Sequence, residues 1–289
     1  MLVYLVLHYK NADVTAQCLD SLLRTDIGDS QIVVVDNASN NGSYEVLLDK
    51  FCNEKCFHFL KNEENLGYAA GNNVGFRYAK NVLGADWIVL LNNDVIIEQS
   101  NFQQILMEEY DKARFYVAGP DIVTPDGNSQ NPYLSVCPAK KDILKKLFHD
   151  YVVLLLMKMR MQQKIKKFLH YDGSIFQHNE IQTIRDFKGV LHGSCIIFSP
   201  DYIKNFNGLY NGTFLYCEEE ILCYILMKLG YTYCYLKSLQ VVHYHSVSMK
   251  REIKDENLRK MQEISRRIES YKKFLRIVKS KNNIGDFLL

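Results

Sequence analysis

The stretch that most constrains the fold is residues 87–95, where a continuous apolar run ends in two amides and a carboxylate. Residues 87–91 include β-branched and aromatic side chains, which is typical of a strand buried on both faces of a parallel sheet. Ligands of open α/β sheets bind beyond the carboxyl ends of the strands. Asp94 could therefore hold a divalent cation that bridges to substrate phosphates. A simple turn would also explain Asn92, Asn93 and Asp94.

The first third of the chain alternates apolar runs with helical patterns. Strands are predicted at residues 2–7, 32–35 and 57–60, and helices at 13–23, 44–51 and 70–80. This alternation predicts an α/β fold with a mostly parallel central sheet flanked by helices. Right-handed crossovers would bring the loops after the strands to one edge. Four side chains are expected to meet there, namely Asp36, Asn65, Asn72 and Asp94.

A glycine-rich segment follows the third predicted strand. Gly67, Gly71 and Gly75 would let the backbone approach a ligand closely. Their spacing fits neither the dinucleotide-binding fingerprint nor the P-loop, and packing of a helix is the alternative explanation. Asp36 could accept hydrogen bonds from a base N–H or a ribose hydroxyl, with a turn as the alternative for Asp36 and Asn37.

Composition excludes several classes of protein. The 289 residues can form one large domain or two small ones, and the formal net charge of +2 argues against nucleic-acid binding. The eight cysteines form no Cys-x-x-Cys pair, so we expect no zinc site and reduced thiols. The N-terminus is expected to be a strand and not a signal peptide. No apolar run reaches the roughly 20 residues that span a bilayer, and a cytoplasmic protein is expected.

The second half contains longer helices and loops. Helices are predicted at 101–110, 218–229 and 255–279, strands at 116–119 and about 193–199, and loops at 120–138 and 208–214. The loop at 120–138 is expected because it holds four of the five prolines. The helix at 255–279 is expected to pack on the domain or on a partner chain.

Residues 142–169 predict a basic amphipathic helix. Apolar side chains recur at helical spacing, and nine basic residues accompany them: Lys140, Lys141, Lys145, Lys146, Lys158, Arg160, Lys164, Lys166 and Lys167. Such a helix can lie in the headgroup region of an anionic membrane. The alternative is a helix that packs on the domain and turns a basic face to solvent.

Three adjacent glutamates, Glu218, Glu219 and Glu220, begin the helix at 218–229. Acidic residues at a helix N-terminus are favoured by the macrodipole, which is a sufficient structural explanation. Adjacent carboxylates also repel one another, which raises the pKa of one of them. A carboxylate with such a pKa is a candidate general base.

Taken together and in order, these motifs resemble glycosyltransferase family 2, especially its rhamnosyltransferase-like members of bacterial surface-polysaccharide synthesis, which have the GT-A fold. The resemblance rests on the apolar first strand, Asp36-Asn37-Ala38-Ser39, the segment at 65–73 and Asn92-Asn93-Asp94. It implies that Asp36 contacts the nucleotide base and that the triplet binds Mg²⁺ or Mn²⁺ through its only acid, Asp94. The implied nucleotide-sugar site comprises His8, Tyr9, Asn11, Asp36, Asn37, Ser39, Asn65, Gly67, Gly71, Asn72, Asn92, Asn93 and Gly193.

The resemblance also assigns catalytic and metal-binding roles in the second half. Family members place Glu-Asp at the start of the helix at 218–229, where the Asp is the catalytic base. Glu219 matches that Asp and Glu218 the preceding Glu, although Glu218 or Glu220 could be the base because Glu replaces Asp here. A histidine near the end of a late strand completes the metal or diphosphate site, with His243 as the better match and His245 as the alternative.

The expected protein is an inverting, metal-dependent hexosyltransferase. It would move rhamnose or another hexose from a dTDP- or UDP-linked donor to a hydroxyl of a glycan, expected to be lipid-linked, on the inner face of the cell membrane. A GT-A domain at 1–250, with a helical insertion at about 140–170, would precede a helical extension at 251–289 that could form a homo-oligomer. The alternatives are a nucleotidyltransferase, which lacks a basic glycine-rich loop here, and a catalytically inactive nucleotide-binding scaffold.

Overall fold

The first four strands of the protein form the parallel part of its sheet, as the alternating pattern predicts. The computed structural model describes residues 1–25, 28–159, 187–244, 255–281 and 283–289. The strands are β1 (Leu2–His8), β2 (Gln31–Asp36), β3 (Phe57–Lys61) and β4 (Trp87–Asn92). β1 pairs in parallel with β2 and β4, and β2 pairs in parallel with β3. The buried run at 87–91 is therefore an inner strand, with neighbours on both sides.

The second half of the sheet is mixed. Its strands are β5 (Val95–Ile96), β6 (Val117–Val123), β7 (Cys195–Phe198) and β8 (Tyr233–His243). The order across the sheet is β3-β2-β1-β4-β7-β6-β8-β5. β7 is antiparallel to β4 and β6, β8 is parallel to β6, and β5 is antiparallel to β8.

The expected loop at 120–138 begins later than predicted, because β6 continues through Pro120 to Val123. The pairing of β6 with β8 shifts register between Pro120 and Asp121. Proline has no N–H to donate to a ladder and is tolerated where the pairing is irregular. This irregularity explains why a strand passes through a residue that argues against one.

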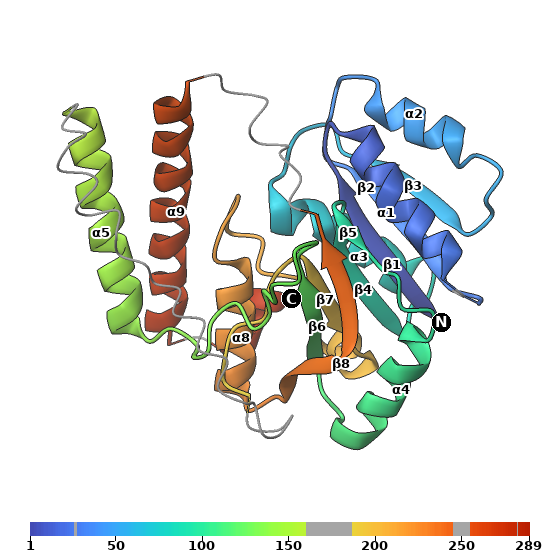
Figure 1. Ribbon diagram of the computed structural model, residues 1–289. Coiled ribbons are helices and arrows are strands. Elements are labelled where there is room, and N and C mark those ends of the chain that lie inside the picture. The colour runs from blue at the N-terminus through green and yellow to red at the C-terminus, as the bar shows by residue number, and fades with distance from the viewer. Residues whose placement is uncertain (26–27, 160–186, 245–254, 282) are drawn as a thin grey trace.

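Helices cover both faces of the sheet (Figure 1). On one face, α1 (Ala12–Arg24), α2 (Ser43–Lys50) and α4 (Phe102–Ala113) pack on the side chains of Leu2, Tyr4 and Val6. On the other, α3 (Tyr68–Asn81), α7 (Pro200–Asn205) and α8 (Glu218–Leu229) pack on Val3 and Leu5. Alternate residues of one strand thus enter two separate cores, and the α/β class with flanking helices is confirmed.

Two long helices, α5 (Lys140–Lys158) and α9 (Glu256–Lys279), lie side by side at the edge of the molecule (Figure 1). The basic helix predicted at 142–169 is present to Lys158, and the rest of it lies outside the described residues. α9 packs back on the domain, since its Tyr271, Phe274 and Leu275 join the core that contains α8. A short 3₁₀ helix, η3 (Ile284–Leu288), follows α9 and packs near α8. Among the described helices, none has the length and hydrophobicity needed to span a membrane.

Candidate active site

Parallel pairing brings the ends of β1, β2 and β4 to one edge of the sheet. His8 is the pairing partner of Asp36 between β1 and β2, and Leu7 is the partner of Asn92 between β1 and β4. The polar residues that follow these strands therefore lie at the same edge, where ligands of such sheets bind. This is the edge at which the sequence places the nucleotide-sugar site.

The carboxylate of Asp36 is buried at the end of β2. It accepts hydrogen bonds from the Ser39 hydroxyl and from the Ser39 backbone N–H, the latter at 3.2 Å from Oδ2. Ser39 Oγ in turn accepts from the Lys10 N–H at 2.8 Å. Ser39 therefore joins the loop after β2 to the loop after β1 and holds the carboxylate in one orientation.

His8 is a fully buried partner of this loop. Its Nδ1 lies 2.7 Å from Thr15 Oγ1 and its Nε2 lies 2.8 Å from Ser43 Oγ. Burial lowers the pKa of His8 to about 4, although the charge of Asp36 opposes this effect. His8 is therefore neutral at physiological pH, and its contacts tie α1 and α2 to the end of β1. Its predicted role in binding the donor stays a prediction.

The side chain of Asn37 organises the segment after β3. Its Nδ2 donates to Asn65 Oδ1 at 3.0 Å and to the Gly67 carbonyl at 3.1 Å. Its Oδ1 accepts from Asn62 Nδ2 and from the Leu66 N–H, each at 3.1 Å. Asn37 and Asn65, which the sequence assigns to the donor site, thus form one hydrogen-bonded network in place of a simple turn.

Glycine is required at position 67 by space and backbone geometry, and Gly71 lies in tight contact with Asn37. Gly67 has a φ of 82°, and a Cβ there would collide with the carbonyl of Phe214. The Tyr68 N–H donates to that same carbonyl at 2.8 Å. At Gly71 a Cβ would lie 3.1 Å from Asn37 Oδ1. Glycine therefore allows the segment to lie between the end of β2 and the loop at 208–214.

The other predicted donor-site residues after β1 and β4 have mixed surroundings. Asn11 caps α1, since its Oδ1 accepts from the Val14 N–H at 3.4 Å. Tyr9 is partly exposed, and the Lys10 Nζ lies 4.8 Å from the centre of its ring. Asn93 donates to Thr15 Oγ1 at 2.9 Å. These contacts explain Asn11 and Asn93 locally, whereas Tyr9 stays accessible to a ligand.

Asn72 carries a polar atom that the local structure leaves unsatisfied. Its Nδ2 donates to the Tyr68 carbonyl at 3.0 Å. Its Oδ1 is buried and has no hydrogen-bond partner among the described residues. A buried polar atom in this state is rare and calls for a partner outside the protein. Asn72 is therefore the member of this segment with a free acceptor.

Asp94 and His243 are brought together by the pairing of β5 with β8, in which Val95 lies opposite His243. Both side chains are buried, and His243 Nε2 lies 3.2 Å from Asp94 Oδ1. His243 Nδ1 lies 2.8 Å from Gln130 Oε1. His245 lies outside the described residues. Asp94 and His243, which are separated by about half the chain in sequence, thus lie together in one predicted site.

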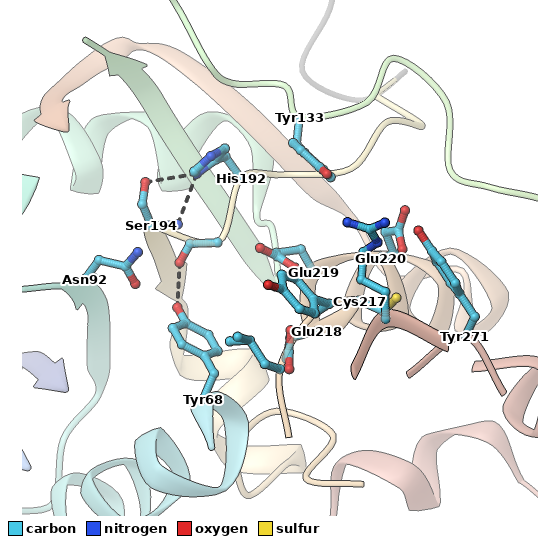
Figure 2. Close-up of a pocket in the computed structure, with 14 residues that line it drawn as sticks. Tyr68, Asn92, Tyr133, His192, Ser194, Cys217, Glu218, Glu219, Glu220 and Tyr271 are labelled. Atoms are coloured by element: carbon cyan, nitrogen blue, oxygen red, sulfur yellow. Dashed lines mark hydrogen bonds between the residues drawn. The ribbon is translucent and has the colours of Figure 1, made fainter. Parts of the chain in front are cut away.

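A pocket of about 250 Å³ lies beside this pair, at the start of α8 (Figure 2). His192 connects the two places, because its ring lies 5.6 Å from the ring of His243 and also lines the pocket. The lining comprises Tyr68, Asn92, Tyr133, His192, Gly193, Ser194, Leu215, Tyr216, Cys217, Glu218, Glu219, Glu220, Arg267 and Tyr271. The predicted catalytic glutamates and the predicted Asn92 and Gly193 therefore share one cavity.

The three glutamates at the start of α8 have different surroundings. Glu218 is buried and accepts from the Thr213 hydroxyl at 3.1 Å. Glu220 is buried and forms an ion pair with Lys146 Nζ at 2.5 Å. Glu219 is partly exposed and points into the pocket. All three side chains line the pocket, and Glu219 is the most exposed of them.

Burial raises the pKa of both Glu218 and Glu219 above the ordinary value for a glutamate. The charge of Glu219 adds to this effect at Glu218, and the charge of Glu220 adds to it at Glu219. The pKa of a general base works best near the operating pH. Both shifts are in the direction that suits proton transfer, and of these two carboxylates Glu219 is the more exposed.

Gly193 is matched to Glu219. A Cβ at position 193 would collide with the Glu219 carboxylate. The Gly193 carbonyl accepts from the Tyr68 hydroxyl at 2.6 Å, which joins the pocket to the glycine-rich segment (Figure 2). Glycine at this position therefore leaves the space that the carboxylate fills.

The turn before α8 is strained. Tyr216 and Cys217 have φ values of 77° and 70°, and neither is glycine. Left-handed backbone at such residues costs on the order of 1–3 kcal/mol each and clusters at functional sites.

Several pocket residues were not predicted as site residues from the sequence, among them Tyr133, His192, Arg267 and Tyr271. Arg267 and Tyr271 come from α9, one turn apart, and Arg267 makes two 2.8 Å hydrogen bonds to Asp150 of α5. Helical periodicity predicts that the two residues share one side of α9. It does not predict that this side packs against α8. No local motif in the sequence marks these residues.

The chain belongs to glycosyl transferase family 2, because the model of that family matches residues 5–182. The chain is similar to the "Low-salt glycan biosynthesis hexosyltransferase Agl10" of Haloferax volcanii, with 24% identity over 197 residues. That match covers 68% of this chain and 53% of the relative, so the chain spans about half the length of the relative.

Solved structures share the fold at low sequence identity. A mannosyltransferase from Pyrobaculum calidifontis, in complex with GDP-Man and Mn²⁺, matches with a TM-score of 0.55 at 11% identity, over 92% of this chain and 69% of that one. GalNAc-T7, solved with UDP, GalNAc and Mn²⁺, matches with a TM-score of 0.57 at 12% identity, over 85% of this chain and 44% of that one. TarS of S. aureus matches with a TM-score of 0.53 at 13% identity, over 99% of this chain and 68% of that one. The expected GT-A fold is confirmed.

Proposed function

We propose that this protein transfers a hexose from a nucleoside diphosphate sugar to a hydroxyl group of a glycan, with inversion at the anomeric carbon. Family membership and the similarity to a hexosyltransferase of glycan biosynthesis support the class of reaction. The observation that carries the proposal is the placement of Glu219, partly exposed in a pocket beside the sheet edge while its two neighbours are engaged.

The donor would lie along the carboxyl ends of β1, β2 and β4. Asp36 has the fixed orientation that recognition of a base or ribose requires, and Asn72 offers a buried acceptor. Among the fold relatives, the P. calidifontis enzyme is solved with GDP-Man and TarS with UDP-GlcNAc. For this chain we propose a dTDP- or UDP-linked hexose, with rhamnose as one candidate.

The surroundings of Asp94 and His243 fit a divalent cation. When His243 Nδ1 donates to Gln130 Oε1, Nε2 faces a carboxylate oxygen of Asp94 at 3.2 Å. An imidazole nitrogen and a carboxylate oxygen at this separation are both ligands that a divalent cation accepts. Outer hydrogen bonds of this kind orient histidine ligands. Mg²⁺ or Mn²⁺ held here would offset charge on the donor diphosphate.

The protein residues would perform the displacement as follows. Glu219 accepts the proton of the acceptor hydroxyl, and the oxygen forms a bond to the anomeric carbon on the face opposite the diphosphate. The bond from that carbon to the diphosphate oxygen breaks, and the electron pair leaves with the nucleoside diphosphate. Tyr133, Tyr216 and Tyr271 around Glu219 offer aromatic surfaces for a sugar acceptor.

We propose a lipid-linked glycan as the acceptor and residues 1–250 as the catalytic domain, with the helical insertion at about 140–170. The extension at 251–289 supplies Arg267 and Tyr271 to the pocket. The pocket therefore depends on the extension, which supports a role for α9 in binding the acceptor.

Thermal-shift screening of nucleotide sugars with and without Mn²⁺, followed by an assay of nucleoside diphosphate release, tests the proposal. We expect one nucleotide sugar to stabilise the protein in the presence of metal and to be consumed when a glycan acceptor is added. A nucleotide sugar that binds and is never consumed with any acceptor would favour the inactive scaffold. The substitution of Glu for Asp at position 219 is the observation that keeps this alternative in view.

A further inference from the structure

Helix α5 carries a stripe of exposed apolar side chains along its outer face. The stripe consists of Leu144, Phe148, Tyr151 and Leu155 of the helix, together with Met159, the residue immediately after the helix. These residues are spaced three or four apart, so they lie on one side of a helix. Phe148 is 70% exposed and Leu155 is 56% exposed. Five large apolar side chains in one row are more than the scattered exposure normal for a protein surface.

The stripe is distinct from the side of α5 that packs in the protein. Val153 is buried against Ile264 and Ile268 of α9, and Asp150 is buried in its ion pair with Arg267. α5 therefore has two apolar sides, one covered by α9 and one exposed, with Tyr151 at the border between them because Lys272 Nζ of α9 lies 5.7 Å from the centre of its ring. The predicted alternative, a helix that packs on the domain and turns a basic face to solvent, agrees with this arrangement, and the exposed apolar row is an additional feature.

Exposed lysines accompany the stripe. Lys140, Lys141, Lys145 and Lys158 are all exposed, and at 3.6 residues per turn they fall at the two edges of the apolar row. The two acidic residues of α5 do not offset them fully, because Asp150 is buried with Arg267 and Asp142 receives the Ala139 N–H at the start of the helix. An apolar row bordered by lysines complements a surface that is apolar inside and anionic at its boundary.

We propose that this face of α5 docks the protein on an anionic lipid bilayer, with the apolar row in the headgroup boundary and the lysines at the phosphates. A second copy of the chain fits less well, because pairing two such faces would bring their lysines together. Lys146 is not part of the docking face, since it is paired with Glu220. The inference goes beyond the proposed transfer reaction and does not depend on it.

The proposed docking face of α5 lies close to the pocket. α5 contacts the pocket wall through Lys146 at Glu220 and through Asp150 at Arg267. A bilayer against the outer face of α5 would therefore lie one helix away from the residues that surround Glu219 (Figure 1). If the proposed function holds, a lipid-linked acceptor would reach the pocket from that side.

Vesicle co-sedimentation of the full chain tests the proposal. The vesicles are phosphatidylcholine, alone or mixed in equal parts with phosphatidylglycerol. We expect binding to the anionic vesicles that weakens as salt is added, because the lysine contribution is screened. Phe148→Ser with Leu155→Ser should lower that partition roughly tenfold or more through lost apolar burial. Lys141→Glu with Lys145→Glu should also lower it.

The matched control is Val46→Ser with Leu48→Ser on α2, where both side chains are exposed outside the stripe. This pair should bind vesicles like the unmodified protein. An unchanged thermal midpoint of the Phe148→Ser, Leu155→Ser protein shows that the fold persists, as expected for exposed sites.

Three results would overturn the proposal. One is equal binding to neutral and anionic vesicles, and another is binding that the Phe148→Ser, Leu155→Ser change leaves intact. The third is a dimer in vesicle-free solution, detected by light scattering, that this same change dissociates. That result would assign the stripe to a second copy of the chain.

Discussion

At the scale of single residues, the candidate base is defined by what its neighbours contact. Glu218 is held by Thr213 and Glu220 by Lys146, which leaves the Glu219 carboxylate facing the pocket. The family motif leaves open which of the three adjacent glutamates is the base. Their hydrogen bonds and exposure favour Glu219. Glu219 is one methylene longer than the Asp of the family motif, and the bare Gly193 gives it room.

Glu219→Gln should abolish transfer while donor binding persists, because the amide keeps the shape of the side chain and cannot accept the proton. The loss of a general base typically lowers the rate by about 10² to 10⁴. Turnover and donor affinity would be measured on the same preparation. Glu218→Gln is the control and should retain far more activity. Full activity of the Glu219→Gln protein would show that another group is the base.

Asp94→Ala should remove the dependence of nucleotide binding on metal. The reason is that, in the part of the chain that the structure describes, Asp94 is the carboxylate that lies against His243 in the proposed cation site. Calorimetry of a nucleoside diphosphate with Mn²⁺ and with EDTA measures this directly. We expect the unmodified protein to bind more tightly with Mn²⁺ and the variant to bind alike in both. Metal-independent binding by the unmodified protein would refute the site.

At the scale of elements, the contact between α5 and α9 contains a buried ion pair that also borders the pocket. Asp150 is almost fully buried, and Arg267 binds both of its oxygens at 2.8 Å. Removing one partner of such a pair leaves a buried charge without compensation, whereas removing both is often tolerated. This difference makes the contact testable by a double-mutant cycle.

Arg267→Met should lower the free energy of unfolding by about 3 kcal/mol, at the low end for buried pairs because Arg267 is partly exposed. Arg267→Met with Asp150→Leu should recover most of that loss. Urea unfolding followed by circular dichroism provides the measurement. Lys260→Met on the same helix breaks an exposed pair with Glu256 and should change stability by less than about 1 kcal/mol. Equal effects of the two single changes would contradict the buried-pair argument.

At the scale of the whole molecule, two kinds of buried group give opposite pH dependences of stability. The raised pKa values of Glu218 and Glu219 mean that the folded protein holds protons more firmly at these sites than the unfolded chain does. Their contribution to stability therefore falls as pH rises toward the folded pKa values.

His8 should make the protein less stable in acid. The unfolded chain binds a proton at this residue near pH 6.5, and the folded protein binds it only near pH 4. The unfolded state thus holds more protons between these values, so the free energy of unfolding falls as pH falls through the window. The contribution lost is at most about 3 kcal/mol. His8→Gln should reduce this slope in unfolding measured from pH 7 to pH 4.

The control for His8→Gln is Thr15→Val, which removes a hydrogen-bond partner of His8 and no titratable group. It should lower stability about equally at every pH and leave the slope in place. A slope that is unchanged by His8→Gln would show that other groups control the acid limb.

The sequence by itself determined the fold class and most of the elements. Strand alternation and helical periodicity depend on neighbouring residues in the chain, so β1 to β4 and their helices could be predicted from local pattern. The strand-end motifs also indicated the edge of the sheet at which Asp36 and Asn65 lie. Pro120 misled the prediction of β6, because whether a proline fits a strand depends on the irregular pairing with β8.

Only the tertiary structure decided which residues complete the site and which surface is left open. Arg267 and Tyr271 reach the pocket, and His192 stands between it and His243, through contacts between segments far apart in the chain. The apolar residues of α5 look alike in sequence, yet Val153 is buried under α9 and Phe148 is exposed. Burial is set by how packed helices share space, and a local pattern carries no information about the neighbour that covers each face.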